Sequence, residues 1–174
     1  GEGDVVSVGG LEVHVVATPG HTADSLSFVV PQDRAVLTGD TVLGRGTTVV
    51  AHPDGQLGAY LSSLERLHAL CGEEGITTVW PGHGPVIDDA LGALDFYLAH
   101  RRERLAQVEA AVLSLVGATS LREALPHVDL DPGTGAAVTP RSVVEAVYAD
   151  VDPVLWGAAE LSVRAQLAYL AERG

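Results

Sequence analysis

Three short segments of the sequence place a metal-competent side chain beside glycine, each directly after a predicted β-strand. The segments are TPGHT (18–22), LTGDT (37–41) and PGHG (81–84), and their metal-competent side chains are His21, Asp40 and His83. Glycine lets the backbone turn sharply and lets another atom approach closely. Strands that all run toward one edge of a sheet would bring these side chains together there. Two imidazoles and a carboxylate suit zinc or a similar divalent ion, so the pattern predicts a metal site at a sheet edge.

Each segment also has a plainer interpretation when it is taken alone. A histidine in a glycine-proline turn is commonly a solvated turn residue, and a Gly-Asp pair after a strand commonly forms an Asx turn or a helix cap. The three segments together favour the metal site, because turn chemistry alone does not explain three such elements at three strand ends.

The first part of the chain, residues 1–87, alternates short strand patterns with glycine and proline turns. Apolar and polar side chains alternate over 11–17, which is the period of a half-buried strand. Asp54 is expected to cap a helix that runs to about Leu70, because apolar side chains recur there at helical spacing. The other predicted strands cover 5–8, 25–30, 34–37 and 76–80.

The pattern becomes helical from Asp88 onward, and recurring leucine and valine side chains predict a long helix to about Val116. Three more helices are predicted: a short one with a Ser120–Glu123 capping box, one over 141–148 with Thr139-Pro140 at its start, and one over 158–170.

The motifs TPGHT, TGD and PGHG, in this order, resemble the second half of the metallo-β-lactamase superfamily. The resemblance implies an α+β fold in which two sheets form an αββα sandwich. It also implies a site for two zinc ions, in which His21 binds the first metal, Asp40 bridges both, and His83 binds the second.

Some segments of the sequence resemble one particular branch of this superfamily. Segments 40–48 and 81–87, and a long helix containing Tyr97, His100 and Arg101, resemble the branch called β-lactamase-like protein 2. In that branch a small winged-helix-like domain follows the catalytic fold.

This resemblance predicts three parts of the chain. They are the C-terminal half of a metallo-β-lactamase-like domain (1–87), a long connecting helix (88–116) and a mostly helical winged-helix-like domain without its β-wing (117–174).

The first-half motif of the family, H-x-H-x-D-H, is absent from the sequence, which also begins with glycine and contains no Met. We therefore expect this chain to be the C-terminal part of a larger enzyme that was truncated. With only three nameable ligands the metal site is expected to be incomplete, and the chain alone to be inactive or nearly so. The exposed half-sandwich is expected to associate with a second copy or with the missing N-terminal half.

For the intact protein, the resemblance implies metal-assisted hydrolysis, in which a hydroxide held between two zinc ions attacks a carbonyl carbon or a phosphorus atom. Asp40 would keep the ions at a fixed spacing. Thr22 and Thr41 are candidates to hydrogen-bond the ligands. Gly44 and Thr47 lie in a loop that either faces substrate or is a plain surface turn.

Charge separates the possible functions. The chain has 10 basic residues, all arginine, against 23 acidic ones, and its net charge is −13. This balance favours a hydrolase of small esters, thioesters or lactones, because a polyanionic partner would be repelled. Two alternatives stay open: an endoribonuclease, which the family branch favours, and a non-catalytic winged-helix interaction module. No apolar run is long enough to span a membrane and no signal peptide is recognisable, so a cytoplasmic location is expected.

Overall fold

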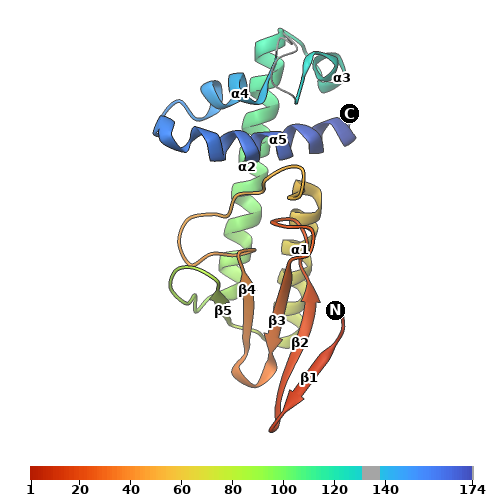
Figure 1. Ribbon diagram of the computed structural model, residues 1–174, viewed down its shortest axis with the longest axis vertical. Helices are drawn as coiled ribbons and strands as arrows, with labels where there is room; N and C mark the ends of the chain where they lie inside the picture. The colour runs from red at the N-terminus through yellow and green to blue at the C-terminus, as the bar shows by residue number, and fades with distance from the viewer. Residues whose placement is uncertain (131–137, 174) are drawn as a thin grey trace. The chain divides into compact units, whose positions relative to one another are not determined.

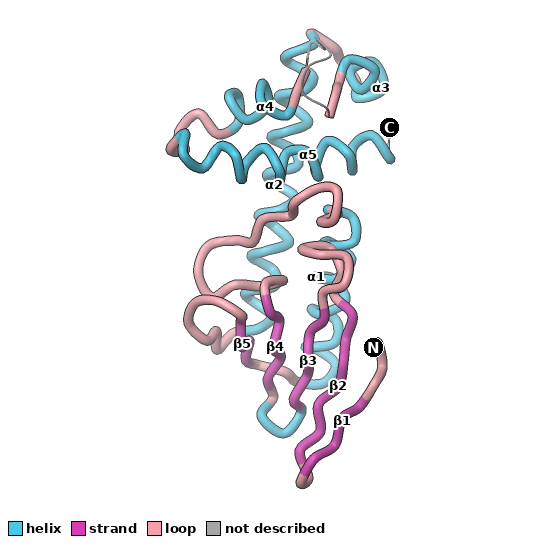
Figure 2. The backbone as a smooth tube through the Cα atoms, viewed as in Figure 1, coloured by secondary structure: helices cyan, strands magenta, loops and turns pink. Residues whose placement is uncertain are grey.

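A five-stranded sheet forms the first part of the computed structural model, which describes residues 1–130 and 138–173. The strands are β1 (Val5–Val8), β2 (Leu11–Ala17), β3 (Leu26–Val30), β4 (Ala35–Gly39) and β5 (Thr78–Pro81). They lie in sequence order across the sheet (Figure 2). Pairs β1–β2, β2–β3 and β3–β4 are antiparallel, whereas β4–β5 is parallel. Strands β2, β4 and β5 therefore point the same way and end at the same edge of the sheet.

Helices cover one face of the sheet over β3, β4 and β5 (Figure 1). The register aligns Val29, Val36 and Val79 across β3, β4 and β5, and all three side chains are buried. Helix α1 (Leu57–Glu74) and the beginning of α2 (Ala90–Val116) lie on one side of the sheet (Figure 1). Their apolar side chains complete this core, in particular Tyr60, Leu64, Leu67 and Leu94, which are all 0% exposed.

The opposite face of the sheet stays partly open. Phe28, Leu37 and Trp80 are aligned across β3, β4 and β5, and each is only half-buried. Edge strand β1 is exposed along its whole length. The apolar alternation predicted for 11–17 therefore belongs to a sheet with one buried and one half-open face.

Helix α1 begins differently from the prediction. Gln56 is its N-cap, without a side-chain capping bond, so the predicted cap at Asp54 is wrong. The Asp54 carboxylate instead accepts a 3.4 Å hydrogen bond from the backbone N–H of Ala23. The helix ends at Gly75, whose φ of +67° is the left-handed conformation that favours glycine.

The chain divides into two compact units, residues 1–48 with 54–100 and residues 49–53 with 101–174. The second unit contains the end of α2 together with α3 (Leu121–Ala124), α4 (Pro140–Val147) and α5 (Trp156–Arg173). Short 3-10 turns lie at Pro31–Asp33, Leu125–His127 and Pro153–Leu155. The core of the second unit contains Val108, Val112, Val143, Val144, Val163 and Leu167, all 0% exposed.

The predicted helix starts at Thr139-Pro140 and at Ser120 have different outcomes. Thr139 caps α4, and the reciprocal bonds with Ser142 form a capping box, so this helix start is confirmed. Ser120 is the N-cap of α3 but makes no side-chain capping bond. Glu123 instead accepts 3.0 Å hydrogen bonds from the backbone N–H and the hydroxyl of Thr119. These bonds lower the pKa of the Glu123 carboxyl, because they stabilise its charged form.

Among the residues that the structure describes, no helix is long and apolar enough to cross a membrane.

We predict that the thiol of Cys71 is unreactive in the folded chain. Its side chain is buried in α1, and this burial, with a smaller contribution from Glu74, raises its pKa to about 11. At pH 8 a thiol-specific reagent should modify it slowly in the native protein and rapidly in denaturing urea. Because the folded pKa is the higher one, stability present below pH 9 should be lost as the pH rises toward 11. Rapid native labelling at pH 8 would contradict this.

Candidate metal centre

The three glycine turns meet at the edge where β2, β4 and β5 end. His21 follows β2, Asp40 directly follows β4, and His83 follows β5. The His21 Nε2 atom lies 3.9 Å from Asp40 Oδ2, and the His83 Nε2 atom lies 3.6 Å from Asp40 Oδ1. Each oxygen of the Asp40 carboxylate therefore faces a different imidazole, across turns that are far apart in the sequence.

This donor set fits a metal-bridging carboxylate. Two ligand atoms of one tetrahedral zinc ion lie about 3.3 Å apart, which is shorter than the nitrogen–oxygen distances of 3.6 and 3.9 Å but of similar size. Within the described parts of the chain, no three His, Cys, Asp or Glu side chains gather closely enough to hold one metal ion. The arrangement instead offers two pairs of donors, His21 with Asp40 and His83 with Asp40, which share the carboxylate.

The side chains at this edge are accessible from solvent. His21 is 28% exposed, Asp40 37% and His83 77%. Further ligands, water and a substrate could therefore reach both sides of the carboxylate. A tightly buried ion pair would leave no such access.

Close backbone packing sets the positions of the Asp40 and His83 turns. The N–H of Gly82 donates to the carbonyl of Gly39 (2.8 Å), and the N–H of Gly44 donates to the carbonyl of His83 (2.8 Å). A Cβ atom on Gly82 would stand 2.8 Å from Asp40 Oδ1. Gly44 therefore has a backbone role at the site, because its N–H holds the His83 turn.

The threonines predicted near the ligands make mostly local contacts. The hydroxyl of Thr22 bonds within its own turn, to Asp24 Oδ1 (2.9 Å) and Ser25 Oγ (2.7 Å). Buried Thr41 lies 3.5 Å from the hydroxyl of Thr18 and so connects the Asp40 turn with the end of β2. Thr47 is half-buried in its loop. Their roles toward ligands or substrate stay predictions.

Sequence reasoning missed the contact of Thr48 with His21, in which Thr48 Oγ1 lies 3.1 Å from His21 Nδ1. It also missed Tyr60, whose hydroxyl donates to the carbonyl of Thr41 (2.6 Å). No spacing rule relates these residues, because they meet only after the loop folds over the sheet edge. The sequence singles out Tyr97 only through the family resemblance. In the structure its hydroxyl accepts a 2.7 Å hydrogen bond from the backbone N–H of Leu43, in the loop that follows Asp40.

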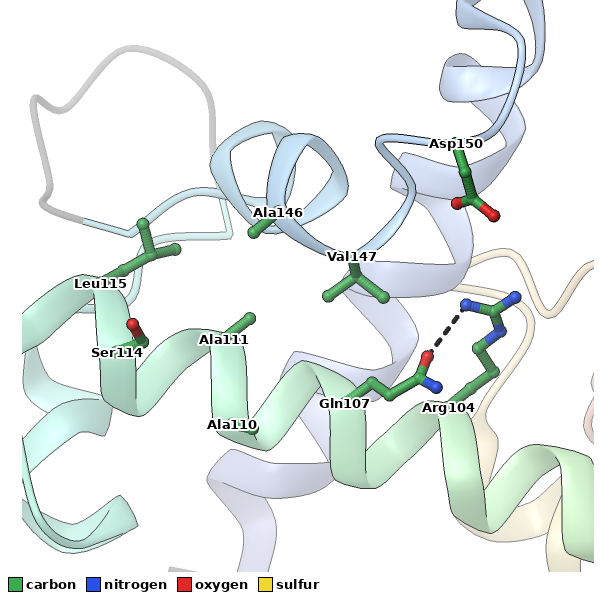
Figure 3. A pocket seen from close by; sticks show the side chains of 9 residues that line it. All are labelled: Arg104, Gln107, Ala110, Ala111, Ser114, Leu115, Ala146, Val147 and Asp150. Atoms are coloured by element: carbon green, nitrogen blue, oxygen red, sulfur yellow. Dashed lines mark hydrogen bonds between the residues drawn. The ribbon is translucent and has the colours of Figure 1, made fainter.

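A separate cavity of about 600 Å³ lies in the second unit, between α2 and the α4 region (Figure 3). Its walls are mainly small side chains, with Arg104, Gln107 and Asp150 toward one end. Arg104 donates to Gln107 Oε1 (2.9 Å), and its guanidinium lies 4.9 Å from the centre of the Tyr148 ring. None of the predicted site residues lines this cavity.

Comparison with known proteins defines the class of protein. Residues 1–87 match the metallo-beta-lactamase superfamily, and residues 139–174 match the beta-lactamase associated winged helix domain. The chain belongs to the metallo-β-lactamase superfamily, which confirms the resemblance of its motifs. The predicted α+β fold with a helical winged-helix region is also confirmed. Members of the superfamily are generally hydrolases and typically depend on metal ions, usually zinc.

The chain is also similar to individual proteins of this superfamily. The chain is 35% identical over 163 residues to the lactamase-like protein vrtG of Penicillium aethiopicum, covering 91% of this chain and 49% of that protein. It is 41% identical over 103 residues to a beta-lactamase-like protein 2 homolog of Caenorhabditis elegans, covering 59% of this chain and 32% of that protein. The chain spans about half or less of the length of these relatives.

A solved structure shares the fold. The crystal structure of a beta-lactamase domain protein from Burkholderia ambifaria superposes with a TM-score of 0.72 at 22% identity, covering 100% of this chain and 46% of that one.

We predict that Gly84→Ala destabilises the chain more than Gly10→Ala. Both glycines have nearly the same positive φ, +91° and +90°, so both variants carry the left-handed strain, about 1–2 kcal/mol. Only at Gly84 would the new Cβ meet backbone, 2.8 Å from the carbonyl carbon of Gly44. Urea unfolding should show an additional loss of about 1–3 kcal/mol for Gly84→Ala. Equal losses would contradict the tight packing of the two turns.

Proposed function

We propose that this chain supplies His21, Asp40 and His83 as ligands of a two-zinc centre in a hydrolase. The observation that carries the proposal is the Asp40 carboxylate, whose two oxygens each face the Nε2 atom of a different histidine, at 3.9 Å and 3.6 Å. Zinc, when bound, activates water and stabilises developing negative charge. Asp40 would set the spacing of the two metals, and the imidazoles would each hold one side.

We further propose that the remaining ligands come from residues outside this chain. Each side of Asp40 offers two donors among the described residues, whereas zinc takes at least three protein ligands in a catalytic site. The exposure of His83, 77%, leaves room for such additional ligands. The 174-residue chain alone is accordingly expected to bind zinc weakly and to be inactive or nearly so.

For the substrate, we propose a small ester, thioester or lactone. The net charge of −13 opposes binding of a polyanion. Helix α2 carries a basic cluster of Arg101, Arg102 and Arg104. It gives little compensation, because Arg101 is only 4% exposed and Arg104 is engaged by Gln107 and Tyr148. Arg141 in the second unit is paired with Glu145 and Glu160. These contacts support a small-molecule substrate over the nuclease alternative.

The metal proposal predicts that zinc binding depends on His21 and His83. Zinc affinity, measured by competition with a chromogenic chelator, should fall at least about tenfold in His21→Ala and His83→Ala, because each removes one of few ligands. His68→Ala is the matched control, since its Nε2 also faces a carboxylate, Asp95 Oδ1 at 3.1 Å. This variant should bind zinc like the original chain.

Two results would count against the metal proposal. Equal affinity in all four proteins would exclude His21 and His83 as ligands. Two tightly held zinc ions per chain after dialysis, lost in both variants, would show that the chain completes the site by itself and would overturn the proposal of outside ligands.

The substrate proposal predicts no saturable binding of single-stranded RNA. Fluorescence anisotropy of a labelled oligonucleotide should stay unchanged at low salt, where attraction between opposite charges is strongest. Tight binding that weakens steeply with added salt would favour the nuclease alternative instead.

A further inference from the structure

The loop formed by residues 41–48 contacts every member of the candidate metal centre. It continues directly from Asp40 and holds the His83 turn through the 2.8 Å hydrogen bond from the N–H of Gly44. At its far end, Thr48 Oγ1 lies 3.1 Å from Nδ1 of His21. A single eight-residue segment is thus in contact with side chains or backbone of all three ligand positions.

The contact at Thr48 has a direct chemical meaning for the imidazole. When a neutral histidine ligates a metal through Nε2, its proton sits on Nδ1, and an acceptor at Nδ1 selects this form and fixes the ring. The Thr48 hydroxyl oxygen can act as such an acceptor when His21 carries its proton on Nδ1, and the side chain is held in place because the residue is 6% exposed. The opposite ring nitrogen of His21 is the one that faces Asp40.

The loop itself is fastened by two tyrosines from the covering helices. The hydroxyl of Tyr97 in α2 accepts from the N–H of Leu43 (2.7 Å) and lies 3.0 Å from the carbonyl of Gly46, to which it can donate. The hydroxyl of Tyr60 in α1 donates to the carbonyl of Thr41 (2.6 Å). Both rings are buried, so these hydroxyls are fixed anchors for the loop backbone.

We propose that Thr48 and Tyr97 are positioning residues of the metal centre. Tyr97 fixes loop 41–48, and Thr48, carried by this loop, orients the His21 imidazole so that Nε2 faces Asp40. The inference rests on the proposed function, since it assigns these residues a role toward a zinc ligand. It goes beyond that function because neither residue is a proposed zinc ligand, and because the anchor Tyr97 lies on a helix outside the three motifs.

The test uses the 174-residue chain and two readouts. The first is the ¹⁵N NMR signal of His21 Nδ1 without metal, assigned by its loss in His21→Ala. The second is zinc affinity from chelator competition. The variants are Thr48→Val and Thr48→Ser, with Thr77→Val at an exposed threonine as the matched control, and Tyr97→Phe with Tyr169→Phe as its control.

We expect Thr48→Val to shift the His21 Nδ1 signal and to weaken zinc binding roughly 10- to 100-fold. Thr48→Ser keeps the hydroxyl and should restore both values, whereas Thr77→Val should change neither. Tyr97→Phe should weaken zinc binding in the same direction, and Tyr169→Phe should not. Rescue by serine separates the positioning role from a general loss of packing.

The outcomes distinguish the two proposals. If zinc binding requires His21 but is equal in the original chain and in Thr48→Val, and the Nδ1 signal is unmoved, the positioning role is wrong while the zinc proposal stands. If no protein binds zinc but Thr48→Val still shifts the Nδ1 signal and serine restores it, the contact is upheld and the zinc proposal fails.

Discussion

The parallel pairing of β4 with β5 is the constraint on which the rest of the site depends. Strands β2 and β4 already point the same way, because two antiparallel steps through β3 separate them. Strand β5 joins this direction only because helix α1 carries the chain back across the sheet before β5 begins. Had β5 paired antiparallel, His83 would lie at the opposite edge from His21 and Asp40.

Glycine residues let the turns at these strand ends pack closely together. The turns after β4 and β5 approach until backbone touches backbone, and a Cβ atom on Gly44 would stand 2.1 Å from the carbonyl oxygen of Pro85. The same close packing lets Gly44 bind the His83 turn. Gly44, Gly82 and Gly84 are therefore required by the short distances between these two turns, which place the carboxylate of Asp40 between two imidazoles.

The two faces of the sheet differ in how far their side chains are buried. Valines beneath α1 and α2 form a closed core on one face of the sheet. The half-open face with Phe28, Leu37 and Trp80 makes no comparable core among the described residues. In the second unit, arginine side chains are used for pairing and stacking within the unit, as Arg141 does with Glu160 and the Trp156 ring.

Local patterns predicted much of the secondary structure, and they failed where a side chain found a different hydrogen-bond partner. The strand predicted over 11–17 and the Thr139-Pro140 helix start were both correct, because each depends mainly on neighbouring residues. The Asp54 cap was wrong because that carboxylate finds the N–H of Ala23, far away in the sequence. The predicted Ser120–Glu123 capping box lacks its Ser120 side-chain bond, and the Glu123 carboxylate instead accepts two hydrogen bonds from Thr119.

By itself the sequence determined the three metal-competent turns, their order and their family, since these depend on residue type and short spacing. Only the tertiary structure decided which Asp40 oxygen faces which histidine, and that loop 41–48 joins all three positions. The contacts of Thr48 with His21 and of Tyr97 with Leu43 span 27 and 54 residues. Residues so far apart in the sequence come into contact when the helices pack on the sheet. No local sequence pattern encodes this packing.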